Sequence, residues 1–209
     1  MKQYILACTV LACVANTKGN LMEPYSSIKP LEYKMQSMFN GYCVDSLRRI
    51  IALHRPKVVV EIGTFTGASA IFMAQLIEPQ ARLYAVDTFL GSVEHHEVPE
   101  YRAFLPNLYL QFLSNCMHAQ VAHKIIPVRM SSEEAAIALN IHPDLIYIDG
   151  SHEENDVFND IMWWHEKMSP NGKMCGDDYG WTSVTAAVHR AASALNKKVR
   201  VNGGFWEFI

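Results

Sequence analysis

The chain has 209 residues, half of them hydrophobic, and its 18 basic and 21 acidic side chains give a net charge of −3. This composition is globular and excludes a disordered or collagen-like chain. The slight acidic excess disfavours a nucleic-acid partner, and no apolar run reaches the roughly 20 residues of a membrane-spanning helix. The five cysteines contain no C-x-x-C pair, which argues against a disulfide framework or a cysteine zinc site.

Residues 1–20 form an N-terminal apolar segment. Lys2 precedes an uncharged stretch from Tyr4 to Ala15, and polar residues follow it. The pattern is typical of two structures, a helix packed on the domain and a cleaved secretory signal. The first, which we slightly favour, implies a cytoplasmic protein, and the second implies the secretory pathway. We expect residues 21–209 to form one domain.

The first strong structural signal is a β-branched run at residues 57–62, followed by Gly63 and Gly67 and then by helical spacing to residue 74. A second strand is predicted over 83–87 and a third over 124–130, where Pro127 favours an edge position. Ser132 is predicted to cap the helix that runs to Leu139. The long connection at 88–118 carries aromatics and histidines, which suits either a substrate lid or a helix packed on the sheet edge.

Further strands and helices alternate along the second half of the chain. Strands are predicted over 144–149 and 173–176, helices over 154–167 and 182–195, and a closing hairpin over 198–209. We expect Trp163, Trp164 and Trp181 to pack between helices and sheet. This alternation predicts an α/β protein with a mainly parallel, doubly wound sheet.

Acidic residues follow three of the predicted strands: Asp87, Asp149 and the pair Asp177-Asp178. Ligands bind beyond the carboxyl ends of such strands, so these side chains are candidates for a site. Asp87 follows Gly63 by about the 20 residues typical of an acid that binds a ribose diol. The glycine spacing E-x-G-x-x-x-G departs from the G-x-G-x-x-G of dinucleotide sites. Together these features favour a nucleoside-containing cofactor, while a plain turn at the glycines and a helix cap at Asp87 stay open.

Four sequence blocks carry a family resemblance: VEIGTFTG at 60–67, AVDTFLG at 85–91, IDGSH at 148–152 and GDDY at 176–179. With these blocks the chain resembles class I S-adenosylmethionine-dependent methyltransferases. It is most similar to the small "IDGSH…GDDY" group related to macrocin-type and catechol-type O-methyltransferases. The resemblance implies a Rossmann-like sheet of about seven strands with an antiparallel last strand and helices on both faces.

The resemblance also assigns roles to residues. Glu61 and Gly63 would lie by the methionine part of the cofactor, Asp87 would hold the ribose, and residues 130–132 would border the adenine. The full set of cofactor residues that it implies is Glu61, Gly63, Thr64, Gly67, Ser69, Asp87, Thr88, Ser131, Ser132 and Asp149.

Asp149, Asp177 and Asp178 fall where the metal-dependent members of the family place their divalent-ion ligands. Converging carboxylates repel one another unless a cation neutralises them, and oxygen ligands suit Mg²⁺. The alternative is that Asp177 and Asp178 cap the next helix. His152, which stands where catechol-type enzymes carry a lysine, would act with Asp149 in catalysis, because a histidine can take a proton near neutral pH. The alternative is a histidine that only hydrogen-bonds its loop.

These features predict a metal-assisted methyltransferase that acts on a hydroxyl group of a small molecule. The alternatives are an NAD-dependent oxidoreductase, which the glycine spacing disfavours, and a non-catalytic nucleoside-binding protein of the same fold. No nucleic-acid partner and no membrane span are expected. The acceptor and the oligomeric state, a homodimer included, stay open.

Overall fold

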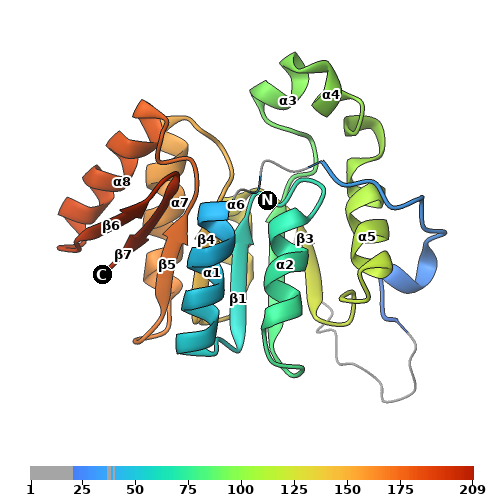
Figure 1. Ribbon diagram of the computed structural model, residues 1–209, viewed down its shortest axis with the longest axis horizontal. Helices are drawn as coiled ribbons and strands as arrows, with labels where there is room; N and C mark the ends of the chain where they lie inside the picture. Colours follow the sequence, from blue (N-terminus) through green and yellow to red (C-terminus); the bar gives the residue numbers. More distant parts are fainter. Residues whose placement is uncertain (1–20, 37–38, 40) are drawn as a thin grey trace, which may run out of the picture.

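The computed structural model describes residues 21–36, 39 and 41–209, and these form a seven-stranded sheet covered by helices (Figure 1). The strand order is β3-β2-β1-β4-β5-β7-β6. The strands are β1 Val58–Ile62, β2 Arg82–Asp87, β3 Ile125–Arg129, β4 Leu145–Ile148, β5 Lys173–Gly176, β6 Val199–Asn202 and β7 Phe205–Phe208. β1 to β5 pair in parallel, and β7 is antiparallel to both of its neighbours. The predicted doubly wound sheet with an antiparallel last strand is confirmed.

Three longer helices cover each face of the sheet. One face carries α1 Gly41–His54, α2 Ala68–Leu76 and α5 Leu108–His118, and the other carries α6 Ser132–Ala138, α7 Glu154–Lys167 and α8 Thr182–Ala194. Successive side chains of a strand point to opposite faces, so Val59 packs with the first helix layer and Val60 with the second. Burial on both faces explains why the central strands read as continuous apolar runs.

The remaining short elements are α3 Val93–Glu97, α4 Pro99–Arg102 and two 3₁₀ turns at Tyr25–Ser27 and Leu105–Asn107. α3 and α4 stand above the sheet at the top of Figure 1. The role of the connection over 88–118 as a substrate lid stays a prediction. The first half of this connection stands over the sheet, and its second half, α5, buries Leu108 and Phe112 in the core.

Two predictions about local structure have different outcomes. Pro127 lies on β3, which is an edge strand as expected, because proline cannot donate a hydrogen bond to a second neighbour. The cap predicted at Ser132 is wrong by one residue. Ser131 is the N-cap of α6, since its hydroxyl accepts from the Glu134 amide at 3.2 Å while the Glu134 carboxylate accepts from the Ser131 amide at 3.1 Å. The reciprocal S-x-x-E pair decides the position.

The predictions for the N-terminal segment, residues 1–15, fall outside the described residues. Within the described part of the chain, no helix has the length and apolar character needed to cross a bilayer.

Candidate functional site

The turn after β1 brings the backbone of two strands together. Gly63 has φ +80°, and its amide donates to the Val86 carbonyl at 2.9 Å. A Cβ at this position would lie 2.2 Å from the Asp149 carbonyl oxygen, so no other residue fits without movement of the backbone. The ends of β1, β2 and β4 therefore meet at one point.

Asp87, at the end of β2, fixes the shape of this turn. Its Oδ2 accepts from the amides of Thr64 and Phe65, both at 2.9 Å, and its Oδ1 accepts from the Phe89 amide at 2.6 Å. Phe65 is thereby held at φ +45°, an uncommon conformation outside glycine. A carboxylate offers about four acceptor positions, so Oδ1 retains capacity for a ligand.

Glu61 lies behind the turn and is fully buried. It accepts hydrogen bonds from the hydroxyls of Thr64, at 2.5 Å, and Ser69. Burial raises its pKa to about 7, although the two hydroxyl donors oppose that shift. Glu61 thus supports the turn from within the core.

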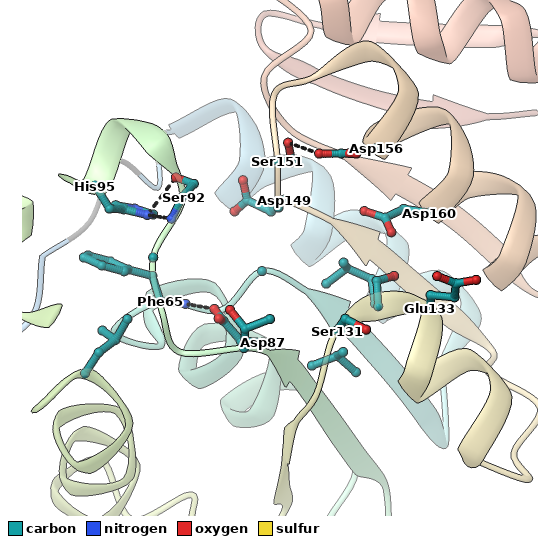
Figure 2. Close-up of a pocket in the computed structure, with 18 of the residues that line it drawn as sticks. Phe65, Asp87, Ser92, His95, Ser131, Glu133, Asp149, Ser151, Asp156 and Asp160 are labelled. Atoms are coloured by element: carbon teal, nitrogen blue, oxygen red, sulfur yellow. Dashed lines mark hydrogen bonds between the residues drawn. The ribbon is translucent and has the colours of Figure 1, made fainter. Parts of the chain in front are cut away.

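A cavity of about 370 Å³ runs along the carboxyl ends of the strands (Figure 2). The predicted cofactor residues that line it are Gly63, Asp87, Thr88, Ser131, Ser132 and Asp149. A second hollow of about 130 Å³ shares Gly63 and Asp149 with the first and is also lined by Thr64 and Ser69. Glu61 and Gly67 line neither of these two hollows. Gly67 is the N-cap of α2, with φ +94°, and lies against the Phe112 ring.

His152 lies at the wall of the second hollow, between two carboxylates. Its Nε2 is 2.8 Å from Oδ2 of Asp178, and its Nδ1 is 3.2 Å from Oε1 of Glu94 on α3. The hydrogen bond to Asp178 raises the pKa of His152, because a nearby negative charge favours the imidazolium form. Glu94 lies in the connection above the sheet, and no sequence pattern predicted its contact with this histidine.

Trp181 stacks on the His152 ring with 4.7 Å between ring centroids. Its side chain is 50% exposed, so the expectation that it packs in the core is wrong. Trp163 packs against the core beneath the second helix layer, as expected, and also lines the large cavity, and Trp164 is fully buried as expected. Trp181 follows the turn after β5, in which Asp178 adopts φ +60°.

The three predicted metal ligands come together, as expected for the ends of adjacent parallel strands. Asp149, Asp177 and Asp178 line the same hollow. Burial and the negative charges of the other two raise the pKa of Asp149 well above its usual range. Neither aspartate after β5 caps α8, whose N-cap is Trp181 without a side-chain hydrogen bond.

Their arrangement does not fit a divalent cation as it stands. Oδ2 of Asp178 is engaged by Nε2 of His152 at 2.8 Å. A metal ion bound to Asp178 would need this oxygen to be released from the histidine. Among the described residues, no group of three or more His, Cys, Asp and Glu side chains is placed to hold a metal ion.

α3 is attached to the glycine turn through His95. The His95 ring stacks on Phe65 with 4.1 Å between centroids and 5° between planes. Its Nδ1 accepts from the Ser92 amide at 3.0 Å, which fixes the start of α3. Because Phe65 is itself held by Asp87, the short helix and the turn form one unit over the cavity (Figure 2).

A segment near the N-terminus is attached to the same turn by Asn115 of α5. The fully buried amide of Asn115 donates to the carbonyls of Lys34, at 2.8 Å, and Thr66, at 2.9 Å, and accepts from the Lys34 amide at 3.1 Å. Gln36 and Phe39 then line the second hollow. This segment, which the sequence did not single out, thus contributes to the site.

Comparison with known proteins gives one family and several structures of the same fold. A family model described as a methyltransferase domain matches residues 60–179. The O-methyltransferase TomG from Streptomyces achromogenes, solved with S-adenosylmethionine, is 17% identical with a TM-score of 0.59, over 79% of this chain and 76% of that one. The O-methyltransferase from Bacillus cereus, solved with S-adenosylhomocysteine, is 14% identical with a TM-score of 0.58, over 85% of this chain and 81% of that one. A search of curated proteins found no match.

Proposed function

This chain belongs to the methyltransferase domain family, and on that premise we propose that it transfers the methyl group of S-adenosylmethionine to a hydroxyl oxygen of a small molecule. The observation that carries the proposal is the position of His152, in the wall of the hollow that adjoins the large cavity. A base at that junction would face both the cofactor and the acceptor. The Streptomyces and Bacillus proteins of the same fold, which bind this cofactor or its product, support the choice of cofactor.

The large cavity would hold the cofactor. Gly63 lets the backbone approach the methionine part, and Oδ1 of Asp87 would accept a hydrogen bond from a ribose hydroxyl. Ser131 and Ser132 line the same cavity and would border the base. Thr64 and Ser69 would support the cofactor site indirectly, because their hydroxyl groups donate hydrogen bonds to the Glu61 carboxylate.

When bound, S-adenosylmethionine supplies an electrophilic methyl group on its sulfonium sulfur. The hydroxyl oxygen of the acceptor would form the new bond to this carbon as the carbon–sulfur bond breaks, with S-adenosylhomocysteine as the product. The hydroxyl proton would pass to Nδ1 of His152, which is buried and lies 3.2 Å from Oε1 of Glu94. Asp178 would orient the ring through Nε2 and stabilise the imidazolium, and Glu94 lies near enough to share in that stabilisation.

The divalent cation stays a prediction from the family resemblance. Since the carboxylates do not fit it as they stand, no step above runs through a metal. His152 lies beside the Asp178 carboxylate and, when protonated, would offset its negative charge.

A thermal-shift screen with S-adenosylmethionine, S-adenosylhomocysteine and NAD tests the proposed cofactor. A ligand that binds only the folded protein, at about 100 times its Kd, adds roughly 2.7 kcal/mol to stability. We expect both sulfur compounds to raise the melting temperature and NAD to leave it unchanged. Stabilisation by NAD alone would favour the oxidoreductase alternative.

A further inference from the structure

The second hollow, in which the acceptor hydroxyl would lie, is rich in carboxyl groups. Glu94, Asp149, Asp177 and Asp178 line it, and none of the described residues at its wall is a lysine or an arginine. The described wall of the large cavity has no lysine or arginine either. An acceptor with a carboxylate or phosphate near its hydroxyl would be repelled by the ionised acids of this wall, whereas a cation would be attracted.

An outer hollow of about 380 Å³, which the mechanism does not use, adjoins the second one. It shares Asp177 and Asp178 with the second hollow and is also lined by Trp181, which is 50% exposed. Sites for small molecules usually measure about 300 Å³ or more, so the second hollow, at about 130 Å³, would hold only the hydroxyl-bearing end of an acceptor. The rest of the molecule would extend over the indole, whose face suits a ring or a cation.

Glu94 is the acid of this set that belongs to the short helix α3, above the sheet in Figure 1. Its side chain is 34% exposed, and its Oε1 lies 3.2 Å from Nδ1 of His152, the atom that would take the hydroxyl proton. Burial acts against ionisation of Glu94, but the pKa of its carboxyl group is nevertheless lowered, with the charge of His152 among the causes. An ionised carboxylate therefore stands where the acceptor hydroxyl must approach.

The acceptor hydroxyl and Glu94 would compete for the same nitrogen. Among the ion pairs between described residues, Glu94 takes part only in the one with His152. An ammonium group beside the hydroxyl would give this carboxylate a second partner and leave Nδ1 to the hydroxyl. A neutral acceptor would displace Glu94 without offering it a partner, and an anionic acceptor would place a like charge against it.

We propose that Glu94 selects the acceptor by binding an ammonium group, so that the substrate is an amino alcohol with its hydroxyl and ammonium groups on adjacent carbon atoms. This inference rests on the proposed function, in which His152 takes the hydroxyl proton. The adjacent position follows from the 3.2 Å between Oε1 of Glu94 and Nδ1 of His152, since each of these atoms would bind one of the two groups. Trp181 would cover the body of the same molecule in the outer hollow.

Binding of three small alcohols to the protein saturated with S-adenosylhomocysteine tests this role. trans-2-Aminocyclohexanol, trans-2-methylcyclohexanol and trans-2-hydroxycyclohexanecarboxylate share a ring and a hydroxyl and differ in the charge of the neighbouring group. In NMR titrations of the wild type, we expect the ammonium compound to have a Kd about 5- to 30-fold lower than the neutral one, as for a partly exposed ion pair, and the anion to bind most weakly. In Glu94→Gln the ratio should fall to within about threefold, because the charge is lost and the side chain keeps its length.

Two exposed acids provide matched controls. Glu97→Gln on α3 and Asp45→Asn on α1 each remove one negative charge, and neither position lines any of the three hollows. Both variants should keep the wild-type ratio. A ratio that falls as far in Glu97→Gln as in Glu94→Gln would mean that the net charge of the protein attracts the cation, and it would overturn the role of Glu94.

The remaining outcomes separate this inference from the proposed function. If the wild type binds the neutral alcohol as tightly as the ammonium compound, or if Glu94→Gln keeps the wild-type ratio, the inference is overturned and the cofactor assignment stands. The same holds if none of the three alcohols binds to protein that holds S-adenosylhomocysteine. If the protein does not bind S-adenosylhomocysteine, the proposed function fails and the inference fails with it.

Discussion

Nε2 of His152 lies 2.8 Å from Oδ2 of Asp178, so two residues 26 apart in the sequence form a hydrogen-bonded pair where β4 and β5 end. The pair leaves Nδ1 as the nitrogen that can take a proton, and Trp181 covers one face of the ring. The arrangement resembles other histidine–carboxylate pairs in which the acid fixes the tautomer and stabilises the imidazolium.

Removal of the imidazole should slow turnover and leave cofactor binding intact. We expect His152→Ala to lower kcat on the order of 10²–10⁴-fold, the usual contribution of a general base. Steady-state kinetics with a hydroxyl acceptor measure this, and titration calorimetry with S-adenosylhomocysteine provides the control. Wild-type kcat in this variant would show that His152 only hydrogen-bonds its loop.

Asp178→Asn should change the pH dependence of the rate. The base must be neutral to take a proton, so kcat/KM should rise with pH through the pKa of His152, which Asp178 holds above its ordinary value of 6.5. Loss of the carboxylate charge lowers that pKa, and the rising limb should move to lower pH. Asp45→Asn is the matched control. A limb that stays in place in Asp178→Asn would remove Asp178 from the pair.

A chelator distinguishes two predictions about the metal, one from the sequence and one from the arrangement of the carboxylates. The family resemblance predicts turnover that a chelator abolishes and added Mg²⁺ restores. Because Oδ2 of Asp178 is engaged by His152, we expect turnover to persist in excess chelator. Assays with and without chelator, followed by Mg²⁺, decide between the two, and loss of activity with recovery by Mg²⁺ would return the three aspartates to the role of ligands.

The stability of the protein should fall as pH rises from about 5 to 8, in part because of Glu61. Below its unfolded pKa of 4.5 the carboxyl group is protonated in both states. Above it the unfolded chain ionises freely, whereas the folded state holds the proton until about pH 7, which favours unfolding by up to about 3 kcal/mol.

Glu61→Gln should therefore flatten the pH profile of the free energy of unfolding, leaving the part that Asp160 contributes in the same direction. Denaturant titrations at several pH values measure it, with Glu166→Gln on the exposed side of α7 as the control. An unchanged slope in Glu61→Gln would mean that Glu61 is ionised in the folded protein.

Much of the fold could be predicted from local patterns. β-branched runs, the glycine turn at Gly63 and the hairpin around Asn202 each specify a structure through neighbouring residues. The sequence also predicted that Asp87, Asp149 and Asp177 lie at the same edge of the sheet, because parallel strands end at one edge.

The features that were missed depend on contacts distant in the sequence. Asn115 lies 81 residues from Lys34, and a polar residue within a helix gives no sign that it is buried. The sequence likewise does not show that Asp160 of α7 is buried, because this helix carries several acidic residues and most such residues are exposed to solvent. Glu94 reaches His152 because α3 is stacked on the glycine turn, which no local pattern specifies.

The central claim is that the large cavity binds the nucleoside cofactor through Asp87. Titration calorimetry with S-adenosylhomocysteine on the wild type, Asp87→Ala and His152→Ala tests it most directly. We predict that the wild type and His152→Ala bind with the same affinity, and that Asp87→Ala binds more weakly by about 1.5–3 kcal/mol, the cost of a lost hydrogen bond to a charged group. No binding to the wild type, or equal affinity in Asp87→Ala, would contradict the account.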